Sequence, residues 1–391
     1  MNIRENINCV NGHTKFKEVD EKFILELLKT RKTNTESHIY IHGPFCAQLC
    51  SFCMHQGLRL GPNAENVKKY YFEYLPELLE RFKPIITNYN VSAIYFGGGT
   101  ADVMPSASMD RIFGAIPDFD KIPCKVFEAH PASLSSGQIS TLSLHNFQGG
   151  YVSFGLQTFD PELCKKENRI YSSPEKLFGK VSTLQVNGIP VNVDLIAFLG
   201  GANFEALQTL KEDITKLVSN VKPDMITIYP LRQAFNYMGQ LTQITKASGT
   251  ELEALKKKKI DLATKMTDLL NSVIYPATEY KRWESPVDRS NINSMDILKI
   301  CMRPQYLTRI SENKTDAIRA YNSSTPPYHV RSRSLIGFGN FGKIYSHSYI
   351  NDEIVYYSMN DRWNTRYFIV HDKNDNTINL EQIGWEEVAD L

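Results

Sequence analysis

The feature that most constrains the fold is a regular alternation of short apolar segments with amphipathic helical segments through residue 231. Six segments read as buried β-strands: His38–His42, Val91–Phe96, Lys125–Glu128, Tyr151–Phe154, Pro190–Phe198 and Met225–Tyr229. The helices expected between them are Ala64–Phe82, Ser106–Ile116, Leu134–Leu144, Pro174–Asn187 and Phe204–Asn220. Strands that alternate with helices form parallel βα units with right-handed crossovers. The sequence therefore predicts an α/β fold, either a partial or full barrel or a doubly wound sheet.

The alternation stops after Pro230. Apolar positions spaced from Leu252 to Val273 predict a helix with one buried face, and its Lys256–Lys259 run is interpreted as a solvated face. The remainder is rich in Asn and Tyr and irregular in periodicity. We expect three parts: an N-terminal helical segment at residues 1–36, a barrel at 37–232, and a C-terminal domain at 233–391 that faces the substrate or covers the barrel.

Composition and charge exclude several classes of protein. The 391 residues carry 44 Lys and Arg against 43 Asp and Glu, a net charge of +1, so the chain lacks the basic character of a protein that binds nucleic acid or anionic membranes. The 42% of hydrophobic residues exclude disorder. The longest apolar run, near Val193–Leu199, is far shorter than the ~20 residues that a membrane span requires. Met1–Lys22 is polar and lacks the apolar segment that a signal peptide contains. We expect a cytoplasmic protein.

Three of the seven cysteines lie within eight residues, directly after the first expected strand. Cys46, Cys50 and Cys53 have the spacing C-x₃-C-x₂-C, so their thiols can converge from one loop on one metal centre. Structural zinc usually takes four ligands in two separated pairs, and the chain has no second pair. Iron–sulfur clusters take thiolates, four for a fully ligated [4Fe–4S] cube. Three thiolates leave one iron open, and an open position is where chemistry occurs. The alternative is three buried or free thiols with a chance spacing.

The other four cysteines are scattered along the chain, and we expect them to be buried free thiols. They are Cys9, Cys124, Cys164 and Cys301. Free thiols and low-potential clusters require a reducing compartment, which agrees with the cytosol.

The cysteine segment, Tyr40-Ile-His-Gly-Pro-Phe-Cys46-Ala-Gln-Leu-Cys50-Ser-Phe52-Cys53, resembles the signature of the radical S-adenosylmethionine (SAM) superfamily. Its beginning is similar to the oxygen-independent coproporphyrinogen III oxidase-like branch. The resemblance implies a [4Fe–4S] cluster on the three cysteines and SAM on the open iron, cleaved to a 5′-deoxyadenosyl radical. Such chemistry belongs to the cofactor, and the protein positions it. With this resemblance we expect a partial (β/α)6 TIM-type barrel with a smaller C-terminal α+β extension.

Other segments follow the sequence order of the same branch. The run Phe96-Gly97-Gly98-Gly99-Thr100 resembles the glycine motif that holds the amino group of SAM, and glycine permits close backbone approach. Polar residues stand mostly near the ends of apolar strands or on the loops beyond them, where ligands gather in βα folds. Each alone could be a satisfied structural group, but the resemblance marks them for the ribose and carboxylate of SAM: Glu128, Gln157, Arg169 and Asp194.

Two further roles are implied by the resemblance alone. The guanidinium of Arg169 would pair with the SAM carboxylate, and Tyr40 would pack near the methionine portion. The resemblance covers about Ser37–Leu231, after which only Ile336-Gly337-Phe-Gly339 is similar to the C-terminal glycine motif of the branch.

The chain also departs from the coproporphyrinogen oxidases. These carry a further cysteine two positions after the third, where this chain has His55. We consider His55 and Tyr40 the candidate catalytic residues, with His55 facing substrate or donating a proton, or else supporting the loop by a hydrogen bond. The segment after Asp194 lacks the usual Gly-Leu-Pro, and Asn340-Phe341-Gly342 replaces small residues of the C-terminal motif.

Three functions compete on this core. A class C methyltransferase would use a second SAM for methyl or methylene transfer, C-methylation or cyclopropanation, to an sp² carbon of a small molecule. A coproporphyrinogen oxidase would decarboxylate a porphyrinogen, and a haem chaperone would bind and deliver haem. The oxidase would require several cations for the carboxylates of its substrate, and the chaperone a histidine or cysteine ligand for haem. Nothing in the sequence distinguishes the available residues from ordinary surface residues: Lys281, Arg282, Arg331, Arg333, His329 and His347.

We therefore predict methyl or methylene transfer, with a [4Fe–4S] cluster and one or two SAM molecules as cofactors. The expected partners are a small-molecule substrate and a flavodoxin- or ferredoxin-type electron donor, with no nucleic acid and no membrane. We expect the protein to be a monomer.

Overall fold

The computed structural model describes residues 15–30, 33–53, 57–201, 204–231, 280–283, 305–309, 334–339, 345–350, 354–361 and 364–371, with scattered positions between 249 and 272. The predicted helix between Leu252 and Val273, with its lysine run, has its apolar positions outside these residues.

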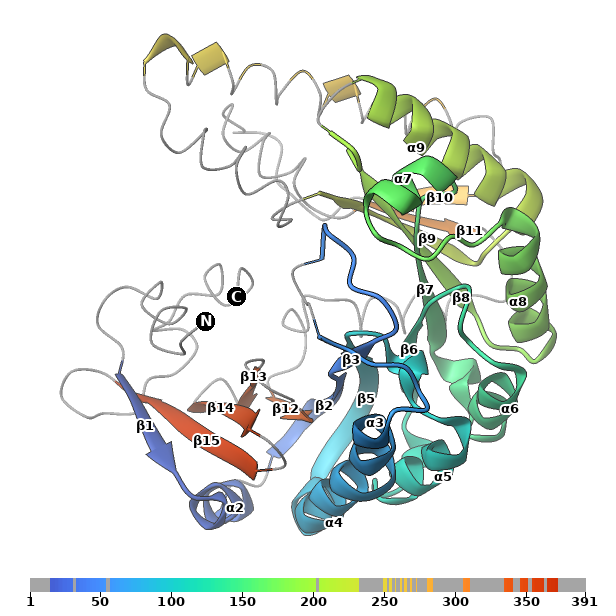
Figure 1. The fold of residues 1–391 in the computed structure, drawn as a ribbon. Helices are drawn as coiled ribbons and strands as arrows, with labels where there is room; N and C mark the ends of the chain where they lie inside the picture. Colours follow the sequence, from blue (N-terminus) through green and yellow to red (C-terminus); the bar gives the residue numbers. More distant parts are fainter. Residues whose placement is uncertain are drawn as a thin grey trace.

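Seven parallel strands form the centre of the fold, in the order β12-β2-β5-β6-β7-β8-β9 (Figure 1). They are β2 (Thr33–Gly43), β5 (Tyr89–Gly98), β6 (Cys124–Ala129), β7 (Tyr151–Gln157), β8 (Val191–Ala197), β9 (Met225–Pro230) and β12 (Ser334–Phe338). All six predicted strands lie within β2 to β9, apart from single residues at the ends of β8. The sheet curves, and the main helices lie on its outer side (Figure 1). This arrangement confirms the partial TIM-type barrel and excludes the doubly wound sheet.

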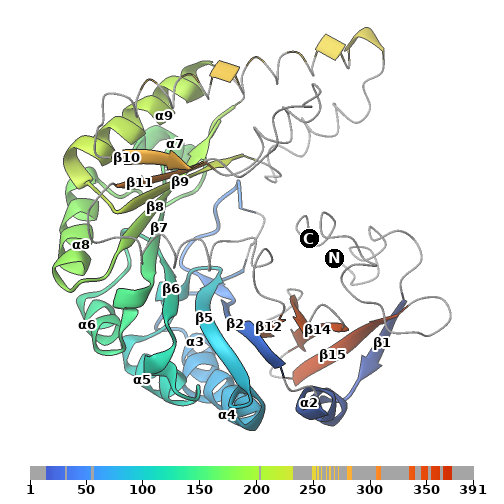
Figure 2. The same cartoon turned by 180° about the vertical axis from the view of Figure 1, so that it is seen from behind.

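Antiparallel strands extend this sheet at both edges, for thirteen strands among the described residues. Beyond β9 lie β11 (Gln305–Arg309) and β10 (Tyr280–Trp283), and beyond β12 lie β13 (Tyr345–Ile350), β14 (Ile354–Asp361), β15 (Asn364–His371) and β1 (Lys15–Val19) (Figure 2). The expected N-terminal helical segment thus contains a strand as well as α2 (Glu21–Thr30). One continuous sheet crosses the predicted domain boundaries, which stay a prediction.

The helices follow the expected order. They are α3 (Glu65–Lys69), η1 (Tyr70–Tyr74), α4 (Leu75–Ile86), α5 (Ser106–Gly114), α6 (Ser136–Leu144), α7 (Pro161–Lys166), α8 (Pro174–Val186), α9 (Phe204–Lys216) and η5 (Leu217–Val221), with short turns η2 (Ala101–Val103), η3 (Phe119–Lys121) and η4 (Phe147–Gly149). At the start of α8 the Ser173 side chain accepts from the amide of Lys176, and past its end Gly188 has φ +75°. These are the expected start and stop signals.

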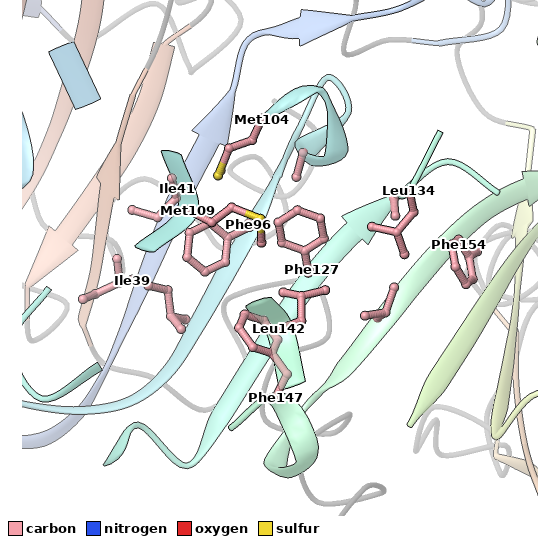
Figure 3. Packing of buried hydrophobic residues seen from close by; sticks show 14 of the residues in the cluster. Ile39, Ile41, Phe96, Met104, Met109, Phe127, Leu134, Leu142, Phe147 and Phe154 are labelled. Atoms are coloured by element: carbon pink, nitrogen blue, oxygen red, sulfur yellow. The ribbon is translucent and has the colours of Figure 1, made fainter. Parts of the chain in front are cut away.

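The hydrophobic core lies between the outer face of the sheet and the helices. Phenylalanine rings fill its centre, and the ring of Phe96 lies beside that of Phe127 (Figure 3), with centroids 6.0 Å apart. The ring centroids of Phe96 and Phe113 are 5.3 Å apart. Successive strand residues point to opposite faces, so the neighbouring Tyr95 belongs to a separate cluster inside the barrel. The inner face is therefore where polar residues on these strands meet.

Candidate active site

The three clustered cysteines lie on the loop that follows β2. Cys46 belongs to the short strand β3 (Phe45–Cys46), which pairs with β4 (Leu58–Arg59). Cys46 and Cys50 are buried, and Cys53 is partly exposed. Phe52 packs with Cys50 and Leu199 against Cys53. One loop thus presents three thiols within a mostly apolar setting.

The donor set fits an iron–sulfur cluster better than a single ion. Within the described part of the chain, no three Cys, His, Asp or Glu side chains gather closely enough to hold one metal ion. In a [4Fe–4S] cluster each thiolate binds a different iron, so three thiolates surround a cube rather than one atom. Three cysteines on one loop therefore suit a [4Fe–4S] cluster better than a single zinc ion.

The glycine turn at the end of β5 packs directly on the cysteine loop. The amide of Gly99 donates to the carbonyl of Gly43 at 2.7 Å, and the amide of Thr100 donates to the carbonyl of Phe45 at 2.9 Å. A Cβ at position 99 would lie 2.6 Å from the Phe45 carbonyl and 2.8 Å from the Cys46 sulfur. Only glycine allows this approach. The predicted glycine motif and the predicted cluster loop are therefore one structural unit.

Burial also affects the thiol nearest this turn. It raises the pKa of Cys46, and a hydrogen bond with the Thr100 side chain opposes that rise. Gly98 has φ +108°, and a Cβ there would lie 2.8 Å from the His42 ring. The turn is consequently fixed from both sides, by β2 and by the cysteine loop.

Aromatic residues line the barrel beside this turn. The Tyr40 hydroxyl lies 3.1 Å from Nδ1 of His42, and the Tyr40 ring stacks on Tyr95 with centroids 6.0 Å apart. The Tyr95 hydroxyl donates to Oε1 of Glu128. A Cβ at Gly97 would meet the Tyr95 ring at 2.6 Å. Tyr40 and Glu128 are thus connected through Tyr95.

Two partly buried carboxyl groups face the same space. Burial raises the pKa of Glu128 to about 7, with the nearby charge of Asp194 adding to the rise and the Tyr95 hydrogen bond opposing it. Burial raises the pKa of Asp194 to about 6. The Asp194 carboxylate accepts from Ser153 at 2.8 Å and from Asn192 at 2.7 Å. These contacts fix the orientation of Asp194 within the barrel.

Gln157 has a backbone conformation that suggests a functional role. Its φ is +75°, rare for a residue with a side chain, and the register between β7 and β8 shifts beside it. Its Oε1 is buried and has no hydrogen-bond partner within the described part of the chain. Strained residues and orphaned buried acceptors cluster at ligand sites. A ligand hydroxyl would satisfy this oxygen.

Arg169 reaches the same region from the segment after α7. Its guanidinium donates to the carbonyls of Gly155 and Leu156 and to the sulfur of Cys50. It therefore lies against the cysteine loop, and its contact with Cys50 is one that the sequence analysis did not predict.

Several predicted residues lie elsewhere or outside the described residues. His55, Cys9, Cys301, His329, Arg331 and Arg333 are outside them. Cys124 and Cys164 are buried, as predicted. Lys281 and Arg282 stand on β10 and His347 on β13.

The inner face also holds polar residues that the sequence analysis did not single out, namely His42, Tyr95, Ser153, Asn192 and Thr227. The Thr227 hydroxyl donates to Asn192 at 3.0 Å, which in turn donates to Asp194. Each lies two positions from a predicted site residue or pairs with one across the sheet. The period-two alternation of strands was the signal that would have found them.

The parallel barrel, the three-cysteine loop and the adjoining glycine turn are together the arrangement of a radical SAM domain. Residues 40–214 match the Radical SAM superfamily. This part of the chain is therefore a radical SAM domain, whose cofactors are a [4Fe–4S] cluster and SAM.

Relatives confirm the resemblance to the coproporphyrinogen oxidase-like branch. The heme chaperone HemW of Buchnera aphidicola is 27% identical over 197 residues, 49% of this chain and 51% of that protein. The oxygen-independent coproporphyrinogen III oxidase of Helicobacter pylori is 29% identical over 225 residues, 54% of this chain and 47% of that protein. The chain thus spans about half the length of these relatives.

The similarity in fold to a solved structure extends beyond residues 40–214. The structure of coproporphyrinogen III oxidase HemN from Escherichia coli superposes with a TM-score of 0.62 at 16% identity, covering 91% of this chain and 76% of that one. Among the described residues, no helix has the length and apolar character needed to cross a membrane.

Proposed function

We propose that this chain is a radical SAM enzyme whose cluster is held by Cys46, Cys50 and Cys53. The observation that carries the proposal is the contact between the cysteine loop and the glycine turn at Gly99, at the end of a parallel barrel. Cys46, Cys50 and Cys53 would hold the cluster, which when bound would supply the electron for reductive cleavage of SAM. The remaining residues of the site bind SAM, orient it and exclude water.

The contacts with SAM are assigned from the family resemblance, and the position of these residues in the barrel supports them. The backbone of Gly97, Gly98, Gly99 and Thr100 would hold the amino group. Glu128, Gln157 and Asp194 present oxygen atoms to the ribose, and the orphaned Gln157 Oε1 suits a hydroxyl donor. Arg169 would pair with the carboxylate, and Tyr40 and Phe52 would pack around the methionine portion.

For the reaction itself we propose methyl or methylene transfer to an sp² carbon of a small molecule, with a second SAM as the one-carbon donor. His55 in place of the further cysteine of the coproporphyrinogen oxidases supports a different substrate. His55 and Tyr40 are the proposed catalytic residues. The electron donor would be a flavodoxin- or ferredoxin-type protein.

The named relatives favour a second candidate. Their assignments as coproporphyrinogen oxidases and heme chaperones support an oxidase-like decarboxylation of a porphyrinogen, or haem binding without carbon chemistry.

A product analysis separates these functions. The reconstituted, reduced chain is incubated with SAM and candidate substrates. Formation of both 5′-deoxyadenosine and S-adenosylhomocysteine supports methyl transfer. 5′-Deoxyadenosine without S-adenosylhomocysteine supports the decarboxylase, and haem binding without SAM cleavage supports the chaperone.

A further inference from the structure

Arg169 joins the end of β7 to the middle of the cysteine loop. Its Nε donates to the Leu156 carbonyl at 3.1 Å, and its Nη2 donates to the Gly155 carbonyl. Its Nη1 donates to Sγ of Cys50 at 3.2 Å. The guanidinium carbon also lies 5.8 Å from the centre of the Phe52 ring. A charged donor is therefore fixed against the sulfur of a proposed cluster ligand.

The two residues before Arg169 hold the same loop. The amide of Ser51 donates to the Glu167 carbonyl at 3.0 Å, and the Ser51 hydroxyl donates to the Glu167 carboxylate. The side-chain Nδ2 of Asn168 donates to the Leu49 carbonyl at 2.8 Å, and its Oδ1 accepts from Nε2 of Gln48 at 2.6 Å. These four hydrogen bonds, in addition to those that Arg169 makes itself, fix the position of Arg169 relative to Cys50. The N–H to sulfur contact is built by the fold and does not depend on one flexible side chain.

We infer that Arg169 tunes the redox centre, because its guanidinium raises the reduction potential of a cluster bound through Cys50. The inference rests on the proposed function, since it takes the three thiols to hold a [4Fe–4S] cluster. Hydrogen bonds to the sulfurs and the net charge around a cluster are among the factors that set its potential. A charged N–H donor stabilises the electron-rich reduced form more than the oxidised form. Removing it makes the cluster harder to reduce.

The tuning role is separable from the carboxylate role assigned to the same side chain. A guanidinium has five N–H groups, and the three contacts above use one each on Nε, Nη1 and Nη2. One N–H on each terminal nitrogen is left for the carboxylate of SAM. A potential measured without SAM therefore contains no contribution from a contact between Arg169 and the SAM carboxylate.

The test is a potentiometric titration of the reconstituted chain without SAM, followed by electron paramagnetic resonance. We expect the Arg169→Met variant to have a more negative midpoint potential than the wild-type chain. Lys166→Met is the matched control, because Lys166 is exposed, ends the helix just before Arg169 and donates to the Gly200 carbonyl rather than to a cysteine. Its potential is expected to match that of the wild type.

An unchanged potential in Arg169→Met overturns the inference, and so does an equal shift in Lys166→Met, which would indicate a general effect of charge. If Arg169→Met binds no cluster, Arg169→Gln is titrated instead, since it keeps an N–H donor without the charge. A more negative potential in that variant supports the inference, and the wild-type potential overturns it. Failure of the wild-type chain to bind a cluster or cleave SAM would refute the proposed function, which is a different result from an unshifted variant.

Discussion

Replacing Glu128 with Gln should change how the stability of the cluster-free protein depends on pH. Burial raises the pKa of Glu128 from its ordinary value of 4.5 to about 7. A carboxyl with a raised pKa stabilises the fold fully below its unfolded pKa, and this stabilisation is lost as the pH rises through the folded value. At about 1.4 kcal/mol per pKa unit, the loss by pH 8 is about 3 kcal/mol.

The Gln side chain does not ionise and so avoids that loss. It keeps the acceptor for the Tyr95 hydroxyl, but its NH₂ group cannot accept the hydrogen bond that the Gly98 amide gives to the carboxylate. The lost hydrogen bond costs about 1 kcal/mol at every pH. The Glu128→Gln variant should therefore be about 1 kcal/mol less stable than the wild type below pH 4.5, and about 2 kcal/mol more stable at pH 8.

Urea denaturation of both proteins at pH 4.5 and pH 8, under reducing conditions, measures this crossover. Asp102, Asp194 and Asp213 also have raised pKa values, but they are present in both proteins and largely cancel in the difference. Glu73→Gln is the control, because Glu73 is exposed on η1. If the stability difference between Glu128→Gln and wild type is the same at both pH values, the assignment of a raised pKa to Glu128 is wrong.

The other predictions concern the cluster loop and the barrel. Cys50→Ala should abolish the visible iron–sulfur absorption and SAM cleavage, and retention of both would refute the cluster assignment. Gly99→Ala should lower cluster content on reconstitution, because its Cβ would lie 2.6 Å from the Phe45 carbonyl and 2.8 Å from the Cys46 sulfur; wild-type cluster content would contradict this. Tyr95→Phe should raise the Glu128 pKa further, since it removes a hydrogen bond that lowers it, and carboxyl infrared titration against Tyr89→Phe on the same strand measures the change. Lys125→Met should destabilise the fold by roughly 2–4 kcal/mol in the same urea assay, because the buried ammonium donates to the carbonyls of three residues, and a loss below about 1 kcal/mol would count against that role.

The barrel could be predicted because its signals are local. Six apolar segments separated by helical patterns coincide with β2, β5, β6, β7, β8 and β9, apart from single residues at the ends of β8. Capping residues predicted the position of α8 correctly. Helix α7 was missed because its six residues are too few to show periodicity. The beginning of β2 at Thr33 was missed because polar residues open that strand.

The contacts between distant segments could not be predicted. Arg169 and Cys50 are 119 positions apart, and Ser51 and Glu167 are 116 apart. Such pairs depend on how the loop after β7 crosses the loop after β2, which no local pattern specifies. The family resemblance predicted which residues belong to the candidate active site. The structure shows which of these residues contact one another.

The place of β12 beside β2 has a consequence for the order in which the chain becomes functional. The strand that leads into the cysteine loop pairs with β5 on one side and with β12, from Ser334 to Phe338, on the other. During synthesis, one edge of β2 therefore stays unpaired until the residues of β12 have left the ribosome. An exposed strand edge can pair with other chains and so promotes aggregation. Gly339, just past β12, approaches the His42 carbonyl so closely that a Cβ would lie 2.9 Å from it. A chain truncated after Leu231 would keep every cysteine of the loop and most of the barrel, yet would be expected to aggregate before a cluster could be inserted.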